Sequence, residues 1–162
     1  MIREPAGAPA PLRGVVAALV VLLVLLLALP VAMTLDRAAT AATITRSDPA
    51  LDPALLHSAV TIVLVFTWAL HLLVAAAAVW FVIKSLQGRR WARIALTLLL
   101  VAAMLGSLNS AGAGPGYLWT VVATTCLQLL ILALLWLPPS VRAFFAAHRA
   151  ASSAPDHAGR GA

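Results

Sequence analysis

The chain has 162 residues, of which 63% are hydrophobic and only 10% charged, and its formal net charge is +6. An ordinary soluble domain has roughly 25% charged residues, so the polar side chains here are too few to cover a soluble fold. The basic residues flank long apolar stretches, which favours a role in membrane topology over nucleic-acid binding.

Three long stretches contain no charged side chain: residues 14–35, 53–83 and 94–141. A run of roughly 20 apolar residues is long enough for a helix to cross a bilayer. The third stretch is interrupted at 112–116 by three glycines and a proline, so it predicts two crossings joined by a turn. The sequence therefore predicts an all-α integral membrane protein, with four transmembrane helices packed as an antiparallel bundle within residues 14–139. The predicted helices cover residues 14–34, 54–84, 92–111 and 117–137.

The distribution of charge predicts the orientation in the membrane. The connection at 84–93 contains four basic residues and no acid, whereas the connection at 34–53 contains three aspartates against two arginines. Basic connections stay in the cytoplasm. We therefore expect a multi-pass protein of the plasma membrane with both ends in the cytoplasm, including an N-terminal tail at 1–13.

The segment after Pro138-Pro139 predicts a short amphipathic helix at 140–149. Val141, Phe144 and Phe145 would lie on one side of it, as in a helix that lies in the membrane interface. Residues 150–162 are small and polar with Pro and Gly, which predicts disorder.

The first apolar run also has features of a cleavable signal peptide. It follows basic residues, and small residues at 38–42 offer a cleavage site. Against cleavage, the run from Val15 to Met33 is longer than usual for a signal peptide. The three later helices keep their orientation under either interpretation.

The sequence lacks the residues that several classes of protein function require. No Asp or Glu occurs from 53 to 155, which argues against a proton-coupled transporter with an intramembrane carboxylate. The single Cys126 excludes an internal disulfide, and no phosphate-binding loop, zinc-protease motif or nucleophile elbow is present. The aspartates at 36, 48 and 52 with His57 match no metal-ligand spacing, and Asp48 and Asp52 each precede a proline, where helix capping is expected. We expect no enzyme activity, no cofactor and no metal.

Polar residues inside the predicted spans mark a candidate interior site. His71 and Gln128 lie near the centres of the second and fourth spans, so we expect both at similar depth and turned inward. They would serve either as interhelical hydrogen-bonding groups or as a pocket for a lipid or small molecule. The full candidate set is His71, Gln128, Thr67, Thr124, Thr125 and Asn109.

A second set of residues predicts contact with anionic lipid headgroups at the cytoplasmic face. Arginines bind phosphate groups, and tryptophan rings anchor at the interface. This set comprises Lys84, Arg89, Arg90, Trp91, Arg93, Arg142 and Arg149. Further partners would be another membrane protein or a second copy of the chain.

Two short segments resemble small four-span membrane proteins of actinobacteria. Residues 88–93 read Gly-Arg-Arg-Trp-Ala-Arg, which is similar to a Gly-Arg-x-Trp-Ala-Arg element between spans of such proteins, and 135–140 read Leu-Trp-Leu-Pro-Pro-Ser. The resemblance implies the four-span layout and no particular activity. Two function classes remain open: an accessory, assembly or scaffold component of the cell envelope, and a small transporter, channel or lipid-handling protein that uses His71 and Gln128.

Overall fold

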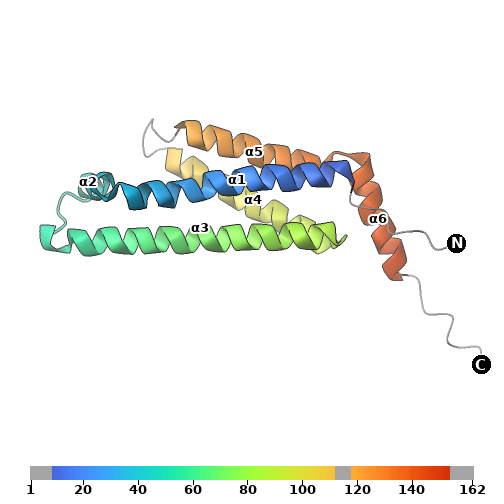
Figure 1. The fold of residues 1–162 in the computed structure, drawn as a ribbon, viewed down its shortest axis with the longest axis horizontal. Coiled ribbons are helices and arrows are strands. Elements are labelled where there is room, and N and C mark those ends of the chain that lie inside the picture. Colours follow the sequence, from blue (N-terminus) through green and yellow to red (C-terminus); the bar gives the residue numbers. More distant parts are fainter. Residues whose placement is uncertain (1–8, 112–117, 154–162) are drawn as a thin grey trace, which may run out of the picture.

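The computed structural model describes residues 9–111 and 118–153, and this part of the chain is helical without strands (Figure 1). Its helices are α1 (Ala10–Leu35), α2 (Arg37–Ser47), the 3-10 turn η1 (Pro53–Leu55), α3 (Leu56–Leu86), α4 (Arg90–Ala111), α5 (Leu118–Trp136) and α6 (Pro139–Ser153).

Four of these helical segments are long and apolar enough to cross a membrane: Ala10–Leu35, Pro53–Leu86, Arg90–Ser107 and Trp119–Trp136. The predicted set of four such helices is therefore confirmed. The first helix begins four residues before the predicted position 14, with Pro11 in its first turn, where a proline loses no intrahelical hydrogen bond.

The connection between the first two long helices contains a helix that the sequence analysis did not predict. Asp36 begins α2, because its side chain accepts a hydrogen bond from the backbone N–H of Ala39 at 2.9 Å. Asp48 and Asp52 accept from the backbone N–H groups of Ala50 and Ala54. These carboxylates therefore cap local turns, as expected for Asp48 and Asp52.

The long helices form four neighbouring pairs. α1 packs on α3 and on α5, and α4 also packs on α3 and on α5. Consequently α3 and α5 occupy opposite corners, with α1 and α4 between them (Figure 1). α2 lies at one end of the bundle and α6 crosses the other.

The main core is concentrated at the end crossed by α6, which we call the packed end. It joins the beginning of α1, the end of α3, the beginning of α4 and the end of α5 to α6. The other half, between this core and α2, we call the open half. The core residues are Leu12, Val15, Ala18, Leu19, Leu22, Ala78, Val82, Leu96, Leu100, Ile131, Leu135, Val141 and Phe145.

Helix α6 differs from the prediction in two respects. Its apolar residues Val141 and Phe145 are buried in the packed end instead of being free to enter lipid. An amphipathic helix can bury its apolar side either in lipid or against other helices. Here the end of the bundle offers enough apolar surface to cover that side of α6. The helix also continues to Ser153, into the first four residues of the tail for which disorder is predicted. The rest of that tail, 154–162, lies outside the described residues.

Candidate functional site

His71 lies at the middle of α3 and is half-buried. Its Nδ1 is 2.7 Å from the backbone carbonyl of Thr67, one turn earlier in the same helix. Because a carbonyl only accepts, Nδ1 must donate, and Nε2 of a neutral ring is then an acceptor. The only described hydrogen bond of this side chain is therefore within its own helix.

Gln128 lies on the buried stripe of α5 with Thr124, Ile131 and Leu135, and only 4% of it is exposed. Its Oε1 and the hydroxyl oxygen of Thr125 are buried without a hydrogen-bond partner among the described residues. The Thr124 hydroxyl instead bonds carbonyls of its own helix. Each unsatisfied group costs about 1–3 kcal/mol, so these two atoms mark a place where a donor is missing.

The structure does not join His71 to Gln128. Their helices occupy opposite corners of the bundle, and no hydrogen bond links the two side chains in the described part of the chain. Thr67 is joined to His71 through its carbonyl, and Thr124 accompanies Gln128. The side chain of Asn109 lies outside the described residues. The predicted interior set therefore divides into a group on α3 and a group on α5.

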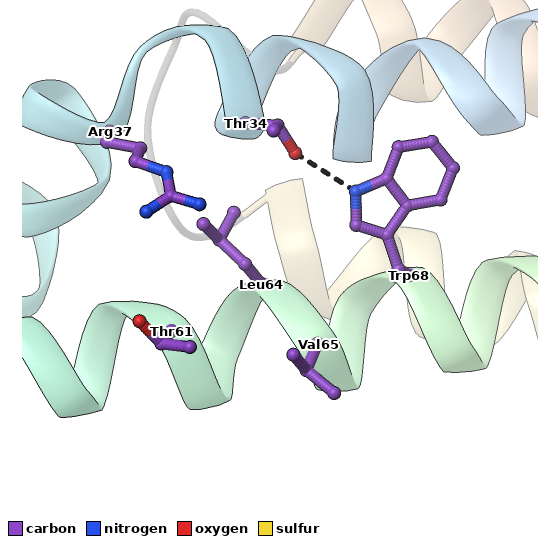
Figure 2. Close-up of a pocket in the computed structure, with 6 residues that line it drawn as sticks. All are labelled: Thr34, Arg37, Thr61, Leu64, Val65 and Trp68. Carbon is purple, nitrogen blue, oxygen red and sulfur yellow. Dashed lines mark hydrogen bonds between the residues drawn. The ribbon is translucent and has the colours of Figure 1, made fainter.

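The open half contains a groove of about 350 Å³ between α1, α2 and α3 (Figure 2). Trp68 closes one side, where its indole N–H donates to the Thr34 hydroxyl at 3.0 Å. That hydroxyl in turn donates to the carbonyl of Pro30 at 2.7 Å. This link is not predictable from the sequence, because nothing local to Trp68 indicates a partner at the end of α1. The lining residues are Thr34, Arg37, Thr61, Leu64, Val65 and Trp68.

The packed end buries a cation. Only 8% of Arg93 is exposed, and its Cζ lies 3.8 Å from the centroid of the Trp136 ring and 5.1 Å from that of Phe145. The Trp136 ring is held by a 2.9 Å hydrogen bond from its N–H to the Thr97 hydroxyl. That hydroxyl donates to the backbone carbonyl of Arg93, also at 2.9 Å. Two aromatic rings and one threonine thus fix the guanidinium in place.

The charge of Arg93 is poorly compensated. Its Nε and Nη2 are buried without hydrogen-bond partners in the described structure. Arg90 and Arg142 are near enough for their positive charges to oppose it, and the sequence has no acid between 53 and 155. A desolvated cation–π contact contributes about 2 kcal/mol, whereas taking a cation out of water costs several. The aromatic rings alone therefore do not offset the burial of this charge.

The connection between α3 and α4 faces α6 across a groove of about 420 Å³. Gly88 has a φ of +76°, and a Cβ at this position would lie 2.5 Å from the ring of His148. Only glycine allows both this backbone conformation and this close approach. The groove is lined by Gln87, Gly88, Arg89, Arg90, Trp91, Phe145 and His148.

The predicted headgroup residues do not all behave alike. Arg89, Arg90, Trp91 and Arg142 are exposed at the packed end, where headgroups would reach them. Arg93 is buried, in contrast to these residues, and its guanidinium stacks on Trp136. The side chain of Arg149 lies outside the described residues.

Within residues 9–111 and 118–153, no three His, Cys, Asp or Glu side chains gather as metal ligands would. No protein-family model, curated protein or solved structure matches the chain. The resemblance to small actinobacterial membrane proteins stays a prediction, and function must be argued from the residues described above.

Proposed function

We propose that the chain is a multi-pass protein of the plasma membrane, with its four long helices antiparallel and both ends in the cytoplasm. The apolar helices and the many large hydrophobic side chains on their outer faces support immersion in lipid. The concentration of arginines at the packed end supports a cytoplasmic position for that end. Trp80, Phe81 and Trp91 form a ring cluster there, with centroids 5.7–6.0 Å apart, which suits the interface.

Within this frame we propose a non-enzymatic role as an accessory, assembly or scaffold subunit that pairs with another membrane protein through α3. The observation that carries the proposal is the thin cover of α3. Only 11% of its most apolar stretch is buried, against 28% for α1, and the half-buried His71 has no hydrogen bond outside its own helix among the described residues. A polar ring beside lipid is costly, and a partner helix with a hydrogen-bond donor would cover it.

Copurification in mild detergent tests this role. We expect a membrane protein in stoichiometric amount with the wild type, and its loss from His71→Leu. The matched control is Leu73→Ala, because Leu73 is exposed on another side of α3 and should keep the partner. A wild-type protein that purifies without any partner, or a partner that both variants retain, contradicts the proposal.

The unpaired acceptors on α5 favour a second candidate function, the handling of a lipid or small solute. Gln128 Oε1 and Thr125 Oγ1 would accept hydrogen bonds from a bound hydroxyl or amine. Mass spectrometry of the purified protein should then reveal a retained molecule that Gln128→Leu releases. A wild-type protein with no such molecule removes the support for this candidate.

A further inference from the structure

The guanidinium of Arg93 lacks hydrogen-bond acceptors among the described residues. The side chain is more than nine-tenths buried, two of its nitrogens have no partner in the described structure, and both neighbouring charges are positive. No carboxylate occurs anywhere in the sequence of α3 to α6. The described helices around Arg93 therefore do not supply the missing acceptor, and a bound anion would supply it.

The position of Arg93 indicates the chemistry of this acceptor. Arg90 and Arg93 lie in the first turns of α4, and the first turn of this helix has no acidic side chain. The N-terminal turn of a helix presents unpaired N–H groups and a partial positive charge, both of which favour an oxyanion. A guanidinium offers several N–H donors in one plane, which suits the oxygens of a phosphate group.

The groove between the α3–α4 connection and α6 is the nearest described hollow that could admit such a group, and it reaches Phe145 although Arg93 itself does not line it. Phe145 belongs to both features, because its ring lines the groove and lies near the guanidinium. Arg89 and Arg90 line the same groove. In the proposed orientation, the groove lies at the level of the inner-leaflet headgroups, where phosphate groups are abundant.

We propose that Arg93, with Arg90 and the N-terminal turn of α4, forms a discrete site for a phosphate group, and that the phosphate of an anionic phospholipid occupies it. The inference rests on the membrane location proposed above and adds a single defined ligand site to it. It differs from general attraction between a basic surface and an anionic membrane, because one buried side chain should govern it.

Thermal unfolding of the full-length protein in neutral detergent tests the site, with and without added phosphatidylglycerol. We expect the lipid to raise the Tm of the wild type and not that of Arg93→Met, in which an apolar side chain still packs on Trp136. Arg13→Gln is the matched control, since Arg13 is an exposed arginine in α1, whose beginning lies at the same end. The Arg13→Gln protein should show the same rise in Tm with phosphatidylglycerol as the wild type. Equal shifts in wild type and Arg93→Met would overturn the proposal.

Lipid titration followed by native mass spectrometry gives a second readout that does not require unfolding. Losing a charge-assisted pair of hydrogen bonds should weaken the tightest phosphatidylglycerol site by about 10- to 100-fold in Arg93→Gln. The Arg13→Gln protein should stay within about twofold. An equal loss in the two variants would show diffuse attraction instead of a site.

Inorganic phosphate identifies the source of the phosphate group. We expect it, at millimolar concentration, not to reproduce the Tm shift given by phosphatidylglycerol. A shift with inorganic phosphate that Arg93→Met removes would contradict the lipid assignment and indicate a soluble phosphate compound. These assays in detergent do not depend on orientation or on a partner protein, so the site and the proposed function can fail separately.

Discussion

The two halves of the bundle are built in different ways. At the packed end, five helices contribute to one core, a cation is enclosed by aromatic rings, and α6 covers the end. In the open half, the middle of α3 is only half-buried, and a groove lies between the first half of α3 and the helices α1 and α2. The packed end is thus the half with the larger buried core, and the open half is the one through which we propose that a partner binds.

Each half nevertheless contains one tryptophan–threonine hydrogen bond between two packed helices that are far apart in the sequence. Trp136 donates to Thr97 at the packed end, and Trp68 donates to Thr34 in the open half, at 2.9 and 3.0 Å. The first bond supports the ring on which Arg93 stacks, whereas the second borders an open groove. The same pair of side chains, tryptophan and threonine, thus forms a hydrogen bond in two different surroundings. Matching substitutions in the two bonds therefore allow a direct comparison of the halves.

Truncation of buried leucines should show the largest difference between the halves. Leu96 is fully buried in the packed end, so Leu96→Ala should lower the free energy of unfolding by about 2–4 kcal/mol. Leu64→Ala should lower the free energy of unfolding by less. Leu64 lines the groove of the open half, so fewer atoms surround the space that its side chain leaves. Thermal unfolding in mild detergent measures both. The exposed Leu98→Ala is the control, and an equal loss at 64 and 96 would remove the distinction between the halves.

The docking of α6 should depend on the absence of a side chain at Gly88. Gly88→Ala introduces a Cβ against His148 and strains a residue with positive φ, so we expect a loss of about 1–3 kcal/mol. The control is Gly106→Ala, where a Cβ meets no atom within 4 Å and helix propensity improves. Limited proteolysis of α6 and the Tm would report the change. A Gly88→Ala protein as stable as Gly106→Ala would show that α6 does not dock in this way.

Removal of the two tryptophan–threonine hydrogen bonds should show the smallest difference in stability between the halves. Replacing either tryptophan by phenylalanine removes the donor, at roughly 1 kcal/mol for a bond between membrane helices. Trp136→Phe should lower the Tm by more than Trp68→Phe does, because the smaller ring also weakens the contact with Arg93. Comparing Tm values of the two variants measures this order, and the reverse order would place the stronger link in the open half.

The sequence predicts the long helices well, because a run without charges has few alternatives to a bilayer. It does not predict α2, which has no apolar periodicity and is indicated only by Asp36 as a capping residue. The sequence predicts the amphipathic pattern of α6 but not what covers its apolar side, because the same apolar residues can face either lipid or the end of the bundle.

The candidate sites were harder to predict than the helices. His71 and Gln128 are recognisable as polar residues at mid-span, but their placement on opposite corners depends on the order of helices around the bundle. Arg93 looks like any arginine at the end of a span. Its burial depends on Trp136, which is distant in the sequence and is brought to it only by the packing of α4 on α5.

The orientation of the packed end is tested most directly by reporter fusions in living cells. Fusions at Arg89 and after Arg149 should both report the cytoplasm, and a fusion at Ala42, within α2, should report the exterior. This result would place the arginine-rich end beside the inner leaflet and the open half toward the outside. An exterior signal at Arg89 or after Arg149 would contradict the account.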